Sequence, residues 1–319
     1  MKIAVVGLGP IGVAAAKAVV ADPGMELVEL VDVAPAVVGT LPVEDGPVVV
    51  EELSGDADVA ILCTTSYFDA IAPLVRKCIQ QKTHVISSCE EMLWPKYRHA
   101  ELAAEIDKEA EAAGVSLLGT GVNPGFVLDY FPAVVSSMVL EVSAVTAVRR
   151  VKAESRREPL QRKVGATMTV GEFNGLKAQG KIGHKGMAES VCLLAAALGK
   201  TIPAGAVVET LEPLTTDKPL DSALGMIEPG KVRGMHNTGG WEGDGLKLFL
   251  DLIMAVGEPE SFDSVDVQGP VPMKVRVETG TPGDSATVAA LVNGCRVLPR
   301  SGPGLRTMLD VGGVLAARV

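Results

Sequence analysis

Aromatic residues are scarce in this 319-residue sequence, where Phe, Trp and Tyr together make up only 3%. Positive charge is also short, because 29 Lys and Arg stand against 39 Asp and Glu, which gives a net charge of −10. Few aromatics argue against a platform for stacked nucleic-acid bases, and negative charge disfavours binding to phosphate backbones or anionic membranes. We therefore expect neither a nucleic acid nor a membrane as a partner.

Metal-binding and disulfide patterns are missing as well. The four histidines show no metal-ligand spacing, and the five cysteines are an odd number without C-x-x-C spacing. We expect no bound metal, and free thiols in a reducing cytosol. Residues 3–20 carry Lys17 as their only charge, but three glycines and a proline interrupt them, so we expect a strand, a turn and a helix rather than a signal or membrane segment.

The chain does have a strong nucleotide-binding motif near its start. Lys2 and an apolar run, 3–6, lead into Gly7, Gly9 and Gly12, which have G-x-G-x-x-G spacing, and a helical stretch, 13–20, follows. This strand, turn and helix context is typical of a dinucleotide-binding Rossmann-type sheet.

Each residue of the motif has an expected role. Gly7 makes the tight turn, Gly9 lets the backbone approach a pyrophosphate, and Gly12 lets helix and strand pack closely. Pro10 suits the first helical position, and the N–H groups that begin with Ile11 can bind an anion. The alternative is that the glycines only allow close packing.

Asp32 supports the nucleotide interpretation. It ends the next predicted strand, 25–32, and lies 20 residues after Gly12, where a carboxylate would meet the adenosine ribose hydroxyls. Because this acid repels a 2′-phosphate, we favour NAD over NADP, although some sites with Asp accept both. The alternative is that Asp32 only ends a strand.

Strands and helices alternate through the first part of the chain. We predict strands at 58–63 and 83–88 around a helix at 67–81, a pattern typical of a parallel sheet covered on both faces. Ligands bind beyond the carboxyl ends of such strands, which makes Thr64 and Thr65 candidate cofactor residues.

Two adjacent acids, Glu90 and Glu91, follow the strand that ends at Ser88. A carboxylate placed there can take a proton from an attacking amine and stabilise a cationic iminium. A solvated loop, or an acid satisfied by a helix dipole, is the other interpretation. Cys89 is expected to be a small buried residue rather than a nucleophile.

Length and pattern predict two domains. We expect an α/β chain with a dinucleotide-binding domain at 1–125, an α+β substrate and dimerisation domain at 126–290, and a segment at 291–319 that packs back on the first domain. We predict helices at 95–113 and 126–138 and, in the second half, strands at 145–151, 206–214, 231–236, 246–253 and 271–278. The basic segment 154–163 can hold a substrate carboxylate or pair with acids of a partner subunit.

Five short motifs in order over nearly the whole chain resemble the 2,4-diaminopentanoate dehydrogenase family and its native amine dehydrogenase relatives. The motifs are Val85-Ile86-Ser87-Ser88-Cys89-Glu90-Glu91, Gly119-Thr120-Gly121-Val122-Asn123-Pro124-Gly125-Phe126, Arg156-Arg157-Glu158-Pro159-Leu160-Gln161-Arg162-Lys163, Gly183-His184-Lys185-Gly186 and Gly283-Asp284-Ser285-Ala286-Thr287. Dihydrodipicolinate reductases fit less well, because they carry a paired-histidine segment and this chain has no His-His.

The resemblance implies a dihydrodipicolinate-reductase-like architecture, a nicotinamide cofactor, a homodimer and the interconversion of an amine with a carbonyl compound plus ammonia. It places the acid that acts on the amine at Glu90, with Glu91 second. Asn123, Arg157 and His236 fall in segments that border the cofactor or the substrate. A lone histidine such as His236 is more often structural than catalytic.

The substrate stays open between a diamino acid and a simple ketone or amine. We hypothesise that ammonia adds to a carbonyl, that Glu90 collects and returns protons, and that the resulting iminium accepts a hydride from the nicotinamide. The alternatives are a carbonyl or imine reductase of the same fold and a dinucleotide-binding sensor without turnover.

Overall fold

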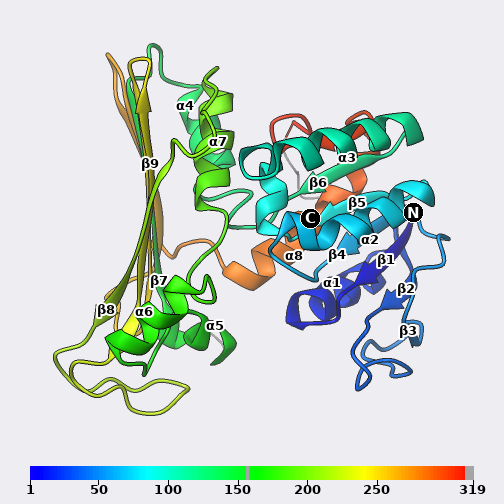
Figure 1. The fold of residues 1–319 in the computed structure, drawn as a ribbon, viewed down its shortest axis with the longest axis horizontal. Helices are drawn as coiled ribbons and strands as arrows, with labels where there is room; N and C mark the ends of the chain where they lie inside the picture. The colour runs from blue at the N-terminus through cyan, green and yellow to red at the C-terminus, as the bar shows by residue number, and fades with distance from the viewer. Residues whose placement is uncertain (156–157, 313–319) are drawn as a thin grey trace. The chain divides into compact units, whose positions relative to one another are not determined.

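The computed structural model describes residues 1–155 and 158–312, which form two compact units (Figure 1). Unit 1 is Met1–Phe126 together with the stretch that starts at Pro282, and unit 2 is Val127–Thr281. Each unit is built around its own β-sheet, which confirms the predicted α/β fold class. The chain returns to unit 1 at Pro282, so helix α8 (Gly283–Val297) belongs to unit 1 as a whole.

Unit 1 contains a seven-stranded sheet in which all neighbouring strands are parallel. Its strand order is β13-β6-β5-β4-β1-β2-β3. The strands are β1 (Lys2–Val6), β2 (Glu26–Val31), β3 (Val49–Val50), β4 (Val59–Leu62), β5 (His84–Ser87), β6 (Ser116–Gly119) and β13 (Gly304–Arg306). The central strands β4 and β6 are buried along their whole length, as expected of parallel strands covered on both faces.

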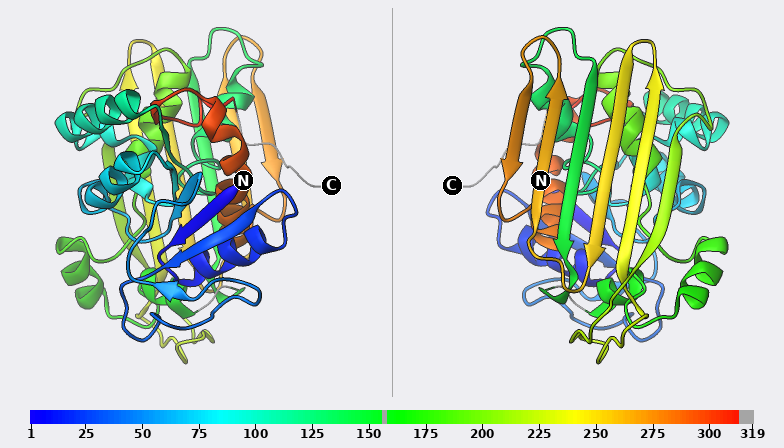
Figure 2. Two further views of the ribbon diagram at one scale, coloured as in Figure 1. Left: turned by 90° about the vertical axis from the view of Figure 1, so that its right-hand side faces the viewer. Right: turned by 90° about the vertical axis from the view of Figure 1, so that its left-hand side faces the viewer.

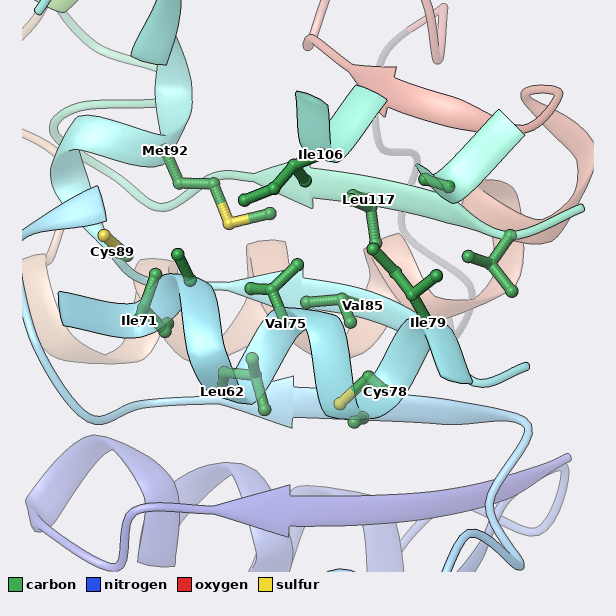
Figure 3. Close-up of a cluster of buried hydrophobic side chains, with 14 of the residues drawn as sticks. Leu62, Ile71, Val75, Cys78, Ile79, Val85, Cys89, Met92, Ile106 and Leu117 are labelled. Atoms are coloured by element: carbon green, nitrogen blue, oxygen red, sulfur yellow. The ribbon is translucent and has the colours of Figure 1, made fainter. Parts of the chain in front are cut away.

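Helices pack on this sheet in two pairs. Helix α1 (Pro10–Val20) packs against α8, and α2 (Phe68–Gln80) packs against α3 (Ala100–Ala113). The inner side of α2 has apolar residues at helical spacing, and they meet Leu62, Val85 and Leu117 of the sheet in one buried cluster (Figure 3). The short 3₁₀ helices of unit 1 are η1 (Glu90–Leu93), η2 (Pro95–Tyr97) and η4 (Leu298–Arg300).

Unit 2 contains a six-stranded mixed sheet of order β12-β11-β7-β10-β9-β8 (Figure 2, right). The pair of β7 and β10 is parallel and the other pairs are antiparallel. The strands are β7 (Ala144–Lys152), β8 (Val208–Thr215), β9 (Val232–Gly243), β10 (Leu246–Ala255), β11 (Phe262–Gln268) and β12 (Met273–Val277). Its helical elements are α4 (Tyr130–Ser136), η3 (Ala153–Ser155), α5 (Glu158–Lys163), α6 (Val170–Ala178) and α7 (Met187–Ala197).

One face of the unit 2 sheet is covered by α7. A Cβ added to Gly239 in β9 would lie 2.5 Å from Cγ of Met187 in α7, so odd-numbered residues of β9 face this helix. Because side chains alternate along a strand, His236 and Thr238 lie on the opposite face of the sheet, the face turned toward the viewer in Figure 2 (right). We call this opposite side the open face.

Several elements differ from their predicted bounds. The helix predicted at 95–113 is η2 followed by α3, and the one predicted at 126–138 is the shorter α4, which begins where the Asp129 carboxylate accepts the Tyr130 N–H at 2.6 Å. Strand β9 runs on from the predicted 231–236 to Gly243, where Asp244 and Gly245, both with positive φ, turn the chain into β10.

Strand β11 was not predicted from the sequence. The strand includes two acids, and one of them, Asp263, is only 1% exposed and forms an ion pair at 3.3 Å with the buried Arg149 of β7. A charge partner on the neighbouring strand therefore allows an acid inside this sheet. Among the described residues, none of the helices combines the length and the apolarity needed to cross a bilayer.

Candidate active site

The turn between β1 and α1 needs glycine at two of its three motif positions for its own geometry. Gly7 has φ +87°, and its N–H donates to the Val31 carbonyl oxygen at 2.9 Å. A Cβ on Gly12 would lie 1.9 Å from the carbonyl oxygen of Gly7. These two glycines are therefore explained by packing alone.

Gly9 is different, because packing does not require a glycine there. Its φ of −66° suits any residue, and a Cβ at this position would meet no atom within 4 Å. Gly9 is the N-cap of α1, Pro10 and Ile11 begin the helix, and no side chain of the described residues caps it. The helix N-terminus therefore keeps donors for an anion at an open position, which fits a dinucleotide pyrophosphate.

Asp32 lies directly beside this turn. One carboxylate oxygen accepts the Leu8 N–H at 2.6 Å, and the other accepts the Ala34 N–H at 2.9 Å. A carboxylate has about four lone-pair positions, so these two hydrogen bonds leave acceptor capacity for the ribose hydroxyls. The acid therefore shapes the turn and also fits the predicted role.

The residues after β4 lie at the same edge of the sheet. The methyl carbon of Thr64 is 2.9 Å from the position of a Cβ on Gly7, so this exposed threonine adjoins the glycine turn. Thr65 accepts the Tyr67 N–H at 3.3 Å before α2 begins. The structure thus brings Gly7, Asp32 and Thr64 together within unit 1.

The two adjacent acids have different surroundings. Glu91 is 7% exposed, and its Oε2 accepts the N–H of Phe68 at 2.9 Å and lies 3.0 Å from Nε2 of His99. Glu90 is partly exposed and is the first residue of η1, three residues beyond the end of β5. The Glu91 carboxylate is therefore committed to the N-terminus of α2 and to His99, a partner that sequence analysis did not identify.

Asn123 lies in the turn after β6 and precedes a cis Pro124. Its Oδ1 and Nδ2 atoms are both buried, and neither has a hydrogen-bond partner among the described residues. Buried amides without partners are rare, so this side chain fits the recognition of a polar group from a ligand. Thr287 of α8 supports the turn by accepting the Val122 N–H at 3.3 Å, a role that sequence analysis did not assign.

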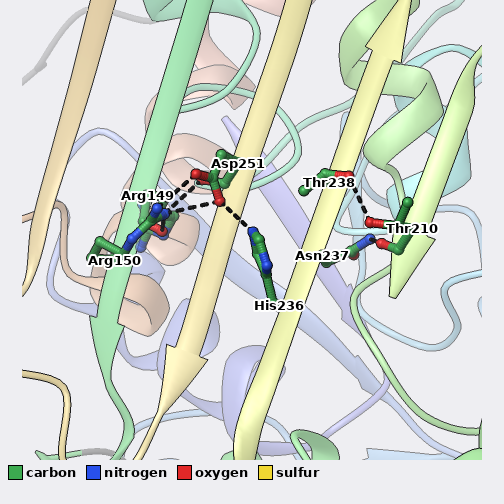
Figure 4. Close-up of polar contacts among 7 residues, drawn as sticks. All are labelled: Arg149, Arg150, Thr210, His236, Asn237, Thr238 and Asp251. Carbon is green, nitrogen blue, oxygen red and sulfur yellow. Dashed lines mark hydrogen bonds and ion pairs between the residues drawn. The ribbon is translucent and has the colours of Figure 1, made fainter. Parts of the chain in front are cut away.

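His236 lies on the open face of the unit 2 sheet (Figure 4). Its Nε2 is 2.8 Å from Oδ1 of Asp251. The Arg150 guanidinium donates a hydrogen bond of 2.6 Å to Oδ2 of the same carboxylate. The three side chains come from neighbouring strands and form one polar network. These contacts are compatible with the structural alternative for His236, and its contact with the substrate stays a prediction.

The other predicted substrate residue, Arg157, lies outside the described residues. Within the same basic segment, the exposed Arg162 pairs with Glu158 one helical turn away at 2.6 Å. Both interpretations of this segment stay predictions.

Cys89 is 2% exposed, and burial raises the pKa of its thiol to about 12. A thiol with this pKa is not a nucleophile near neutral pH, which agrees with the prediction. All five cysteines are free.

A cavity of about 300 Å³ in unit 1 borders the segment after η1. Its walls include Trp94, Lys96, Asp107, Glu111 and Arg306, at the edge strand β13. None of the predicted cofactor residues lines it.

Comparisons with known proteins agree with these features. Residues 126–317 match the family model described as the 2,4-diaminopentanoate dehydrogenase C-terminal domain. The chain is also 34% identical over 263 residues to a 2,4-diaminopentanoate dehydrogenase of Acetoanaerobium sticklandii. The aligned residues cover 80% of this chain and 74% of that protein. The chain belongs to the 2,4-diaminopentanoate dehydrogenase family.

Membership in the 2,4-diaminopentanoate dehydrogenase family confirms the resemblance drawn from the five motifs, and it identifies the chain as an oxidoreductase. Solved structures confirm the fold of this family member. An amine dehydrogenase from Mycobacterium smegmatis superposes with a TM-score of 0.83 at 20% identity, covering 100% of this chain and 97% of that one. A scyllo-inositol dehydrogenase from Lactobacillus casei with bound NAD(H) superposes with a TM-score of 0.57 at 12% identity, covering 94% and 88%.

Proposed function

We propose that this chain is an amine dehydrogenase that interconverts an amine with a carbonyl compound and ammonia, using a nicotinamide dinucleotide. Its family and the amine dehydrogenase with the same fold support this reaction class. The substrate is 2,4-diaminopentanoate or a simpler amine.

The cofactor proposal is supported by the residues of unit 1. Gly9, Pro10 and Ile11 would hold the pyrophosphate at the start of α1, and Asp32 would accept hydrogen bonds from the ribose. Thr64, Thr65 and Asn123 would border the rest of the dinucleotide. The negative charge of Asp32 favours NAD over NADP. When bound, the nicotinamide supplies or accepts the hydride.

The observation that carries the catalytic proposal is the difference in surroundings between Glu90 and Glu91. The buried Glu91 carboxylate contacts the Phe68 N–H of α2 and the ring of His99. Glu90 is partly exposed and follows the carboxyl end of a central parallel strand, where ligands of such sheets bind. We therefore assign proton transfer to Glu90, and Glu91 is the second candidate.

In the proposed mechanism, the Glu90 carboxylate takes a proton from ammonium, and the ammonia that results attacks the carbonyl carbon. Glu90 then carries protons from the nitrogen to the former carbonyl oxygen, which leaves as water, so that carbonyl and ammonium give iminium and water with Glu90 ionised again. The same negative charge then stabilises the cationic iminium of the substrate. Exclusion of water would strengthen this attraction, because a charge pair interacts more strongly at lower dielectric. In the opposite direction Glu90 assists oxidative deamination.

The test is NADH oxidation with a panel of ketones and aldehydes, with and without ammonium. We expect oxidation that depends on ammonium. Oxidation without ammonium would instead indicate a carbonyl reductase, and binding without oxidation a sensor.

The variant Glu90→Gln should lower turnover by roughly two to four orders of magnitude, the usual contribution of a positioned acid or base. NADH affinity should not change. The matched control is Glu44→Gln, the same replacement at an exposed position, which should keep the wild-type rate. Wild-type turnover in Glu90→Gln would reject the assignment.

We further propose a homodimer, with the open face of the unit 2 sheet as the contact surface. Val208 is 70% exposed and Phe249 is 38% exposed, and both pair with Gly240 on this face.

A further inference from the structure

The segment that carries Glu90 has little stability of its own. Helix η1 is a 3₁₀ helix of four residues, Glu90–Leu93, and a single 3₁₀ turn has few internal hydrogen bonds. A catalytic carboxylate needs a defined position, because small displacements are costly in rate. The contacts around η1 must therefore supply the order.

Glu91 connects η1 to two other helices. Its carboxylate accepts the Phe68 N–H in the first turn of α2, and it contacts Nε2 of His99, the N-cap residue of α3. The Glu91 backbone N–H also donates to the Ser66 carbonyl oxygen at 3.2 Å. The negative charge sits at the positive end of α2, so the interaction is favourable electrostatically as well.

The far side of η1 is fixed by packing. Met92 and Leu93 are 0% and 1% exposed, and Met92 belongs to the cluster between α2, α3 and the sheet (Figure 3). A Cβ on Gly119 of β6 would lie 2.4 Å from the carbonyl carbon of Met92, so the backbone of η1 lies directly on the sheet. Rotation of η1 would break either this packing or the Glu91 contacts.

We propose that Glu91 and His99 are positioning residues that fix the direction of Glu90, an inference that rests on the proposed function. Neighbouring residues on a 3₁₀ helix are about 120° apart around its axis, because the helix has 3.0 residues per turn. When Glu91 is held against α2 and His99, the Glu90 side chain cannot point the same way. Two adjacent acids thus have separate tasks, one structural and one chemical.

The experiment compares Glu91→Ala, Glu91→Gln, His99→Ala and the double variant Glu91→Ala with His99→Ala. The control is Glu172→Ala. Like Glu91, Glu172 is a carboxylate at a helix N-terminus, where it forms the capping box of α6 with Thr169 in unit 2. Three quantities are measured for each protein: hydrogen exchange of the peptide 88–97, the Kd for NADH, and kcat for ammonium-dependent turnover.

We expect faster exchange of 88–97 in Glu91→Ala and His99→Ala. Their kcat should fall by roughly 10- to 100-fold, as expected for a misplaced catalytic group, with the Kd for NADH unchanged. Glu91→Gln should recover most of the rate, because its side-chain carbonyl can still accept the Phe68 N–H. The double variant should be no slower than the worse single variant, because both residues act through one contact. Glu172→Ala should change neither kcat nor exchange of 88–97.

Faster exchange with unchanged kcat in Glu91→Ala would overturn the proposal. So would a loss as large as that of Glu90→Gln without recovery in Glu91→Gln, since Glu91 would then be the catalytic acid. If the wild type shows no ammonium-dependent turnover, the proposed function fails, and the exchange measurement decides alone whether Glu91 and His99 hold η1. If Glu91→Ala does not fold, His99→Ala decides in its place, since faster exchange of 88–97 with unchanged kcat in that variant would also overturn the proposal. Glu91→Gln then still decides whether Glu91 is the catalytic acid.

Discussion

At the scale of single residues, the glycine turn separates structural from binding roles. Gly7 and Gly12 are required by a positive φ and by a backbone contact, so their presence is explained without any ligand. Gly9 has ordinary backbone angles and open space around it. The approach of a dinucleotide pyrophosphate would explain a glycine there, and this role stays a prediction.

This contrast gives a direct test of cofactor binding. Gly9→Ala should change the free energy of unfolding by less than about 1 kcal/mol, because its φ suits alanine although alanine is a poorer N-cap than glycine. NADH binding should weaken by roughly tenfold or more, because the methyl group would stand in the path of the pyrophosphate. Urea unfolding and fluorescence titration measure the two effects.

The matched variant is Gly12→Ala. Its methyl group would meet the Gly7 carbonyl oxygen, so unfolding should become easier by about 3 kcal/mol or more. Unchanged NADH affinity in Gly9→Ala would show that the motif only serves packing.

Asp32 provides a second residue-scale prediction. Asp32→Asn keeps an oxygen that can accept the Leu8 N–H but removes the charge that repels a 2′-phosphate. The ratio of NADP to NAD affinity should rise by roughly tenfold, equivalent to about 1.4 kcal/mol. Isothermal titration with both cofactors measures the ratio, and an unaltered ratio would contradict the role of this acid.

At the scale of elements, His84 joins two strands of the parallel sheet. It begins β5, and its Nδ1 accepts the Ser116 N–H at the start of β6 at 2.9 Å. Only the neutral imidazole can accept this hydrogen bond. Burial lowers the pKa of His84, with Asp58 opposing the shift.

The sign of the pH dependence follows from this shift. Because the folded pKa lies below the unfolded value of about 6.5, the unfolded chain binds the proton first as the pH falls. The contribution of His84 to the free energy of unfolding is therefore fully present above about pH 6.5 and is lost as the pH falls below that value. Urea unfolding at pH 7.5 and pH 5 should show this decrease.

His84→Asn should reduce the pH dependence, because the amide oxygen can accept the same N–H without titrating. Part of the slope should remain, since burial also lowers the pKa of His184 well below its ordinary value. An unchanged slope in His84→Asn would exclude His84 as a contributor.

At the scale of the whole molecule, the proposed dimer depends on the open face of unit 2. Phe249→Glu places a charge on this face beside Gly240 and should convert the dimer to a monomer, measured by sedimentation at micromolar concentration. Val33→Glu changes an 81% exposed apolar residue of unit 1 and should leave the assembly intact. A monomeric wild type, or equal effects of the two variants, would argue against this surface.

The parallel sheet could be predicted because its determinants are local. The apolar strands, the glycine spacing after β1 and the acid at the end of β2 all lie within short stretches of sequence. Strand β11 could not be predicted, because Asp263 is buried only through its pairing with Arg149, more than a hundred residues away. The prediction also ended β9 too early, at residue 236. Gly239 lies within the strand because Met187 of α7, a residue distant in the sequence, packs where a side chain would be.

The sequence by itself determined the fold class, the position of the nucleotide turn and the pair of acids after β5, because each depends on neighbouring residues. Only the tertiary structure distinguished Glu90 from Glu91, since that difference comes from the contacts of Glu91 with Phe68 and His99 on separate helices. It likewise placed His236 on the open face, bound to Asp251. The sequence gives the chemical type of each side chain. Its partners, and hence its role, depend on which distant segments the fold places next to it.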